Sequence, residues 1–364
     1  MGRWQSILLI VLISLFTVSG AREIKIKHGD SNHVYNHTLA KILVEYASAV
    51  YISDLTALFT WSCSRCNDMI KGFEMVELIV DVQNCLQAFV GVAHDLSSII
   101  IAFRGTQEHS VRNWIEDLFW KQLDLNYPGM PEAMVHHGFY SAYHNTTLRP
   151  EILNAVQRIR HLHGNIRTIV TGHSMGGALA AFCALDLTVS CSVSPTHLCD
   201  VAPYSFKKGI NCGIQDIELL TFGQPRIGNA DFASYFRKHL PRAVRVTNEN
   251  DIVPHLPPYY SYFPQKTYHH FPREVWLHET TEGILPSLDE KICDGSGEDP
   301  SCSRSVSGNS ISDHLRYYGV DLRADSRGSC KFVMDNHILQ YGQGLDGSII
   351  LSRDPSLQSL IESS

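Results

Sequence analysis

The sequence predicts an α/β fold, in which a central, mostly parallel sheet carries helices on both faces. Strand and helix patterns alternate through the middle of the 364-residue chain, an order that is typical of parallel sheets. The run Ile99, Ile100 and Ile101 is continuously apolar, as in a strand that is buried on both faces. The chain is 44% hydrophobic and 18% charged, which fits one large domain over residues 22–364.

The spacing of apolar residues predicts helices and strands over much of the chain. Apolar residues recur at helical spacing over residues 39–52, 150–163 and 231–240. Strands are expected at 73–82, 86–93, 98–103, 217–222 and 243–247, and the second and third of these should form a hairpin. Two stretches have no such assignment. The first is an unusual insert at 189–216 with little periodicity, and the second is the tail beyond about residue 322.

Residues 1–21 have the three parts of a secretory signal peptide. Arg3 supplies the positive charge, residues 7–16 form the apolar core, and residues 19–21 offer small side chains for cleavage. An uncleaved membrane anchor is the alternative, although the apolar core is short for a span of about 20 residues. The sequence therefore predicts a protein that enters the secretory pathway and is secreted.

Features of the remaining chain agree with an oxidising, extracellular location. Asn36 and Asn145 each begin a glycosylation sequon. Among the ten cysteines, Cys293 and Cys302 bracket a short polar segment and are the best candidates for a disulfide. Four more cysteines are plausible for two further disulfides, with connectivity left open: Cys63, Cys66, Cys85 and Cys330.

Several functions are disfavoured by charge and spacing. The net charge of −7 argues against a nucleic-acid partner. Cys63 and Cys66 have the spacing of a redox motif, but no thioredoxin-like context surrounds them. No second pair of cysteines or histidines stands at metal-ligand spacing, so we expect no metal.

The pentapeptide from Gly172 to Gly176 matches G-x-S-x-G and has Ser174 at its centre. β-Branched residues precede it and an alanine-rich helical stretch follows it. Strand, sharp turn and helix together form a nucleophile elbow, which presents a serine hydroxyl above the sheet. The alternative is a glycine-rich connection with an inert serine. The sequence therefore has to supply the other parts that a nucleophilic serine needs.

A nucleophilic serine needs a base and an acid, which in this type of hydrolase follow it in the order acid, then histidine. Asp251 lies just past the expected strand 243–247, and apolar residues after it can fix its backbone, whereas Glu249 looks solvated. Of the histidines after Asp251, His314 stands between a polar loop and a short helix that we expect it to open. We therefore predict Ser174 as nucleophile, Asp251 as acid and His314 as base.

The tetrahedral intermediate of acyl transfer needs backbone N–H donors. One is expected from Met175, which follows the nucleophile. The other is expected from Thr106, in the loop after strand 98–103, where the neighbouring Gly105 permits a close approach.

An amphipathic helix is expected directly beyond that loop, within residues 108–120. Its apolar face comprises Val111, Trp114, Ile115 and Leu118. One interpretation is a helix that faces the core. The other is a lid that covers the serine and opens at a lipid–water interface, because exposing such a face to water costs roughly 25 cal/mol per Å².

These blocks, in this order, resemble the fungal-type (class 3) triacylglycerol lipase family, in its secreted plant branch. The resemblance covers roughly residues 60–320 and rests on 103–106, 113–114, 137–139, 172–180, 221–229, 250–254 and 313–314. It implies an α/β-hydrolase fold and ester hydrolysis through an acyl-serine. It also implies the same roles for Ser174, Asp251, His314, Thr106 and Met175, and it favours the lid.

The resemblance implies a lipase or carboxylesterase that acts on lipid acyl esters without a cofactor and contacts lipid surfaces transiently. Phospholipids, galactolipids or feruloyl esters are alternative substrates, and a catalytically silent binding scaffold is an alternative of another class. The insert at 189–216 departs from the family pattern. It is either a genuine loop or translated non-coding sequence.

Overall fold

The computed structural model describes residues 26–27, 35–66, 69–106, 113–118, 123, 125–189, 214, 216–259, 267–280, 287–325, 330–342 and 347–353. The signal segment 1–21 and Val111 lie outside these residues, as does nearly all of the 189–216 insert. Within the described part, no helix is both long and apolar enough to cross a membrane.

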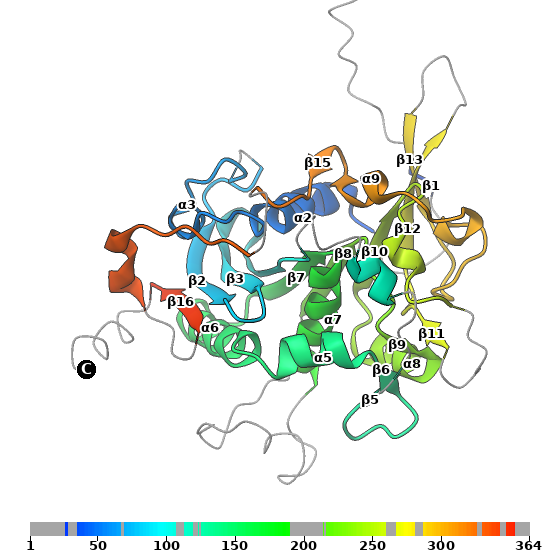
Figure 1. Ribbon diagram of the computed structural model, residues 1–364, viewed down its shortest axis with the longest axis horizontal. Helices are drawn as coiled ribbons and strands as arrows, with labels where there is room; N and C mark the ends of the chain where they lie inside the picture. The colour runs from blue at the N-terminus through cyan, green and yellow to red at the C-terminus, as the bar shows by residue number, and fades with distance from the viewer. Residues whose placement is uncertain are drawn as a thin grey trace, which may run out of the picture.

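A large mixed sheet forms the centre of the molecule (Figure 1). In the described residues its strands lie in the order β1-β13-β12-β10-β8-β7-β4-β3-β2-β16. The five inner strands β4 (Ser98–Phe103), β7 (Arg167–His173), β8 (Ile217–Phe222), β10 (Ala243–Asn248) and β12 (Glu274–Thr280) run parallel to one another. Their carboxyl ends therefore share one edge of the sheet.

The outer strands are mostly antiparallel. β2 (Glu74–Asp81), β3 (Leu86–Ala93) and β4 form a meander, with the expected hairpin turning at His94–Leu96. On the other side β13 (Ser287–Ile292) pairs antiparallel with β12, and β1 (Ile26–Lys27) pairs parallel with β13.

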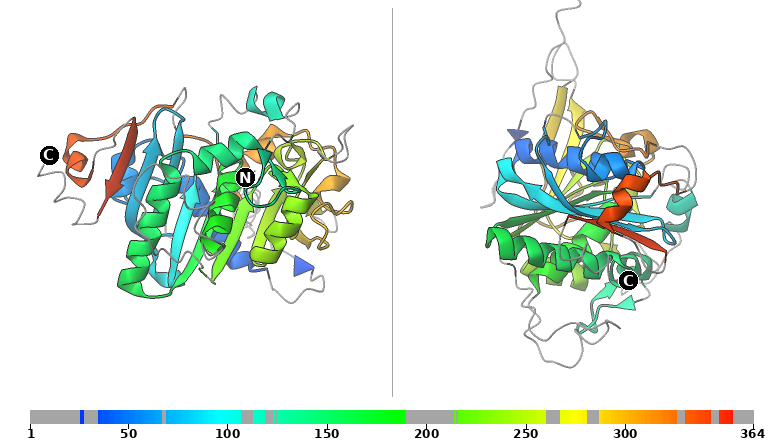
Figure 2. Two further views of the ribbon diagram at one scale, coloured as in Figure 1. Left: turned by 90° about the horizontal axis from the view of Figure 1, so that it is seen from below. Right: turned by 90° about the vertical axis from the view of Figure 1, so that its left-hand side faces the viewer.

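Helices cover both faces of the sheet, as the right-hand view of Figure 2 shows. One face carries α2 (His37–Ala49) and α3 (Leu55–Phe59). The other carries α5 (His137–His144), α6 (Leu148–His163), α7 (Met175–Thr188) and α8 (Ala230–His239). Alternate residues of β4 serve the two cores, because Ile99 and Ile101 face one side and Ile100 faces the other.

Shorter elements complete the fold. A small antiparallel sheet contains β5 (Leu125–Asn126), β6 (Met134–Val135), β9 (Gly228–Asn229) and β11 (Tyr268–His269). After β13, the chain forms α9 (Ile311–His314), β14 (Arg316–Tyr317) and β15 (Val320–Asp321).

The described part of the tail beyond residue 322 belongs to the body of the fold. β16 (Ser348–Ser352) pairs antiparallel with β2 and extends the sheet at its edge. A disulfide joins Cys85 to Cys330, and others join Cys63 to Cys66 and Cys293 to Cys302. Cys183 is buried on α7 as a free thiol.

The described ends of the 189–216 segment lie side by side. The Ile214 N–H donates to the Leu187 carbonyl over 3.1 Å. β8 then pairs with β7 in the regular parallel register from Thr168 and Ile217 onward. The pairing of β7 with β8 is therefore regular, although the 189–216 segment lies between them in the sequence.

Candidate active site

The site lies where the parallel strands end. Arg104 follows β4, Ser174 follows β7, Gly223 follows β8, and Asp251 lies three residues beyond β10. Because parallel strands end on one edge, residues that are far apart in the sequence meet there.

Ser174 occupies the sharp turn between β7 and α7. Its backbone has φ 59° and ψ −130°, a conformation that a residue other than glycine rarely adopts and that costs roughly 1–3 kcal/mol. The Ser174 N–H donates to the Phe222 carbonyl over 2.9 Å, so the turn is tied to the end of β8. On its other side α7 is buried almost all round, and this burial fixes the helix that the turn must enter.

Asp251 and His314 form a buried pair. His314 Nδ1 lies 2.9 Å from Asp251 Oδ2, and the two residues are 0% and 2% exposed. Tyr317 donates its hydroxyl hydrogen to the same carboxylate oxygen over 2.5 Å, and the Val253 N–H donates to the other oxygen over 2.8 Å. Burial and the nearby Asp251 carboxylate hold the pKa of Tyr317 well above its usual value, so this phenol remains a donor.

Backbone pairing joins the two loops that carry this pair. The Ser310 N–H donates to the Asn250 carbonyl over 2.9 Å, and the Ile252 N–H donates to the Ser310 carbonyl over 3.2 Å. The Asn248 amide adds a bond of 3.0 Å to the carbonyl of Asp313. Residues 250–252 therefore hold residues 310–313 in register, and this pairing brings His314 to Asp251.

One detail of the sequence prediction for His314 is wrong. We expected His314 to open a short helix. Instead it ends α9, which begins with Ser310 as its N-cap, and its side chain is fully buried. The polar run before His314 is helical because Ser310 Oγ accepts from the Asp313 N–H over 3.1 Å.

The competing candidates have other partners. Glu249 accepts from the backbone N–H of Glu279 and does not contact His314 through a hydrogen bond in the described residues. His255 packs its ring against Gly308, and His270 hydrogen-bonds the Pro254 carbonyl over 2.8 Å.

Two atoms of the predicted triad remain, the Ser174 hydroxyl oxygen and His314 Nε2. Among the described residues, Ser174 Oγ and His314 Nε2 are both buried and without a hydrogen-bond partner. A bound substrate would supply partners for both atoms. Beside them the Thr106 hydroxyl lies 3.6 Å from the Met175 sulfur, so both expected oxyanion donors belong to neighbouring residues.

Residues 113–118 are helical, as expected. Trp114 is partly buried with its ring centroid 6.1 Å from that of Phe139, and Ile115 and Leu118 are buried in the core on the same side of the sheet. The apolar face therefore points inward, an arrangement that a closed lid and a core helix share.

The structure also places the two sequons and the Cys293–Cys302 pair. Asn36 and Asn145 are both exposed, at the N-cap of α2 and the C-cap of α5. Cys293, Asp299 and Cys302 cluster closely enough to suggest a metal site, but the two sulfurs are joined to each other. That cluster is therefore a cross-link and offers no thiolate ligand.

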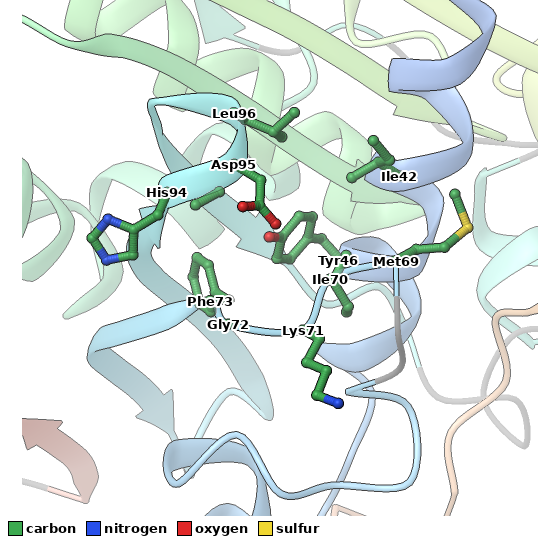
Figure 3. Close-up of a pocket in the computed structure, with 11 residues that line it drawn as sticks. Ile42, Tyr46, Met69, Ile70, Lys71, Gly72, Phe73, His94, Asp95 and Leu96 are labelled. Atoms are coloured by element: carbon green, nitrogen blue, oxygen red, sulfur yellow. The ribbon is translucent and has the colours of Figure 1, made fainter.

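Two hollows elsewhere do not suit an acyl chain. The first, of about 30 Å³, lies between α2 and the β3–β4 turn, at the opposite edge of the sheet, and has room for little more than a water molecule (Figure 3). The second, of about 560 Å³, lies beside Asp313 but is lined by charged groups such as Glu249 and Arg316.

Comparison with known proteins identifies the family. The model of the family described as Lipase (class 3) matches residues 100–261. The chain is 31% identical to a lipase of Rhizomucor miehei over 263 residues, which are 72% of this chain and 63% of that relative. The chain belongs to the class 3 lipase family. It spans less than two thirds of the length of the Rhizomucor lipase.

Further relatives support the same assignment. A secreted mono- and diacylglycerol lipase A of Penicillium cyclopium is 27% identical over 260 residues, 69% of this chain and 74% of that relative. A solved triacylglycerol lipase, whose catalytic centre is described as a serine protease triad, is similar with a TM-score of 0.61 and 28% identity. The similarity covers 82% of this chain and 98% of that one, and it confirms the α/β-hydrolase fold.

Three residues of this class 3 lipase site have no role in the sequence prediction. Tyr317 is a hydrogen-bond donor to Asp251, and Tyr51 and His173 bond to segments around the serine. His173 lies within the G-x-S-x-G motif, which was its only signal. Nothing in the local sequence marks the two tyrosines, because each reaches the site from a distant segment.

Gly223 gives a test of the buried pair. It has φ +56°, and a Cβ there would lie 2.8 Å from Asp251 Oδ2 and 2.9 Å from His314 Nδ1. We expect Gly223→Ala to lower esterase kcat on the order of 100-fold, because the carboxylate and imidazole must move apart.

Gly164 is the matched control, since it has φ +74° with nothing within 4 Å of an added Cβ. Both alanine variants should lose about 1–2 kcal/mol of stability from the backbone alone, measured by urea unfolding. Equal activity of the two folded variants would contradict the role given to Gly223.

Proposed function

We propose that this protein is a serine ester hydrolase that cleaves acyl esters of lipids, with triacylglycerols as the first candidates, through an acyl-serine intermediate. The observation that carries the proposal is the buried pair of Asp251 and His314 at the same edge of the sheet as Ser174, which occupies a strained turn, with Ser174 Oγ and His314 Nε2 unpartnered. Membership of the class 3 lipase family supports it.

The proposed reaction follows from the hydrogen-bond directions. Asp251 accepts from His314 Nδ1, which leaves Nε2 as the base. His314 Nε2 takes the hydroxyl proton as Ser174 Oγ attacks the ester carbonyl. N–H groups of Thr106 and Met175 stabilise the oxyanion. His314 then gives the proton to the departing alcohol oxygen as the acyl C–O bond breaks, and water repeats the sequence on the acyl-serine.

Ser174→Ala tests the nucleophile. We expect this variant to lose at least about 10⁴-fold in kcat for a p-nitrophenyl acyl ester, because no covalent intermediate can form. The wild type should be labelled by a fluorophosphonate probe and the variant should not. Unchanged turnover in Ser174→Ala would reject the assignment, and absence of labelling in the wild type would indicate a silent scaffold.

The substrate class can be determined by measuring kcat/KM on a panel of esters. Mono-, di- and triacylglycerols are the first candidates, because similar proteins are named as lipases of these esters. Phospholipid, galactolipid and feruloyl esters belong in the same assay as the alternatives. The preferred substrate is the one with the largest kcat/KM.

We also propose that the helix at 113–118 belongs to a lid within residues 108–120. Ser174 is 1% exposed, so a lipid acyl ester reaches it only after some segment moves. The helix presents Ile115 and Leu118 inward, and opening would expose these side chains to the lipid surface.

Activity measured across the solubility limit of a triacylglycerol tests the lid. Wild type should gain several-fold or more once an emulsion forms, and Trp114→Ala should gain much less while its hydrolysis of a dissolved ester is little changed. Glu116→Gln, on the exposed face of the same helix, is the control and should behave as wild type. A wild-type rate that rises smoothly through the limit would favour the core helix.

Secretion completes the proposal. The Penicillium relative is named a secreted lipase, and Asn36 and Asn145 are exposed enough to accept glycans. Expression of the full chain in a eukaryotic host should deliver a glycosylated protein to the medium, with an N-terminus near residue 22. Retention in the membrane fraction with residues 1–21 intact would favour the uncleaved anchor.

A further inference from the structure

A buried chain of hydrogen bonds joins the loop before Thr106 to the carbonyl of His314. The Gly105 N–H donates to the Tyr51 hydroxyl oxygen over 3.1 Å. Tyr51 Oη lies 2.8 Å from His173 Nδ1, and His173 Nε2 lies 2.8 Å from the His314 carbonyl oxygen. The three bonds therefore connect four segments: the end of α2, the loop after β4, the elbow, and the end of α9.

The direction of each bond is fixed by chemistry. The His314 carbonyl can only accept, so His173 Nε2 carries a hydrogen and donates. Burial lowers the pKa of His173 well below its usual value, so the ring is neutral and its Nδ1 accepts. Burial raises the pKa of Tyr51, which therefore keeps its hydrogen and donates it to His173. The Tyr51 oxygen is left free to accept from Gly105.

Tyr51 is itself held rigidly. The buried Gln87 side chain donates to the carbonyls of Val50 and Ile52 over 2.9 and 3.1 Å, one on each side of Tyr51. The same amide accepts from Arg104 Nη1 over 3.1 Å. Arg104 and Gly105 are thus both anchored to the segment that carries Tyr51.

The groups that form these hydrogen bonds are closely packed and have little room to move. A Cβ on Gly105 would lie 2.3 Å from the Tyr51 hydroxyl oxygen, 2.6 Å from the His173 carbonyl oxygen and 3.1 Å from Ser174 Cβ. The Gly105 backbone therefore rests directly on the elbow. A shift of Tyr51 or His173 would be passed to Thr106 on one side and to His314 on the other.

We propose that Tyr51 and His173 are positioning residues that set the oxyanion loop and His314 at their working distances from Ser174. The inference rests on the proposed esterase function and extends it. Neither side chain contacts substrate. They act through the Gly105 backbone and the His314 carbonyl, and so they should influence kcat more than KM.

Tyr51→Phe is the central test, because it removes only the hydroxyl. We expect kcat for p-nitrophenyl butyrate, per active site titrated, to fall roughly 10- to 100-fold with KM changed less than about twofold. The rate of phosphonylation of Ser174 by a fluorophosphonate should fall by a similar factor. A folded Tyr51→Phe enzyme with wild-type kcat would overturn the proposal.

Tyr143→Phe is the matched control, since Tyr143 is also fully buried and donates its hydroxyl hydrogen to Asp186 over 3.2 Å. It lies between α5 and the far end of α7 and should lose stability without losing kcat. If the two phenylalanine variants lost kcat equally, Tyr51 would have only a structural role.

His173 is tested by a rescue. His173→Leu removes both bonds, whereas His173→Gln keeps an amide N–H that can donate to the His314 carbonyl. The glutamine variant should recover about tenfold in kcat over the leucine variant, and equal rates would remove His173 from the proposal. A wild-type protein that neither hydrolyses the ester nor reacts with the probe would instead reject the proposed function itself.

Discussion

The hydrogen bond between Asp251 and His314 is the interaction on which the rest of the site depends. It joins residues 63 positions apart, and both are almost completely buried. A carboxylate in such a place is costly unless donors surround it. Here His314, Tyr317 and the Val253 N–H supply them, so one side chain organises a loop after β10, the end of α9 and the end of β14.

The parallel sheet makes this convergence possible. β4, β7, β8 and β10 end on one edge, so Gly105, Ser174, Gly223 and Asp251 come together although more than a hundred residues separate the first from the last. The strained turn at Ser174 costs free energy locally. It persists because β7 and α7 on either side are buried and leave the backbone no easier path.

The sequence alone predicted those residues of the site that have a signal in the sequence around them. Ser174 has a motif, Asp251 follows a recognisable strand, and the strand 98–103 was expected to be central and buried, as it is. It placed His314 at the wrong end of its helix, because a four-residue helix has too few positions for periodicity to fix its start. Tyr317, Tyr51 and Gly223 carried no assigned role, since their importance lies in partners far away in the sequence.

The tail beyond residue 322 also shows that contacts between distant segments are hard to predict from the local sequence. Apart from Cys330, a disulfide candidate, residues beyond 322 have no pattern that indicates a role, yet β16 pairs with β2 at the sheet edge, and Cys330 is joined to Cys85 across 245 positions. A five-residue edge strand is specified by the neighbour with which it pairs, so its own sequence is a weak guide.

The sequence by itself determined the fold class and supplied Ser174, Asp251 and His314 as candidates for the site, because strand periodicity and the G-x-S-x-G motif are local properties of the chain. Only the tertiary structure decided which donors hold Asp251, how Tyr51 and His173 connect Gly105 to His314, and where β16 pairs. Those contacts join segments distant in sequence, and their geometry exists only once the sheet and both of its helical layers are in place.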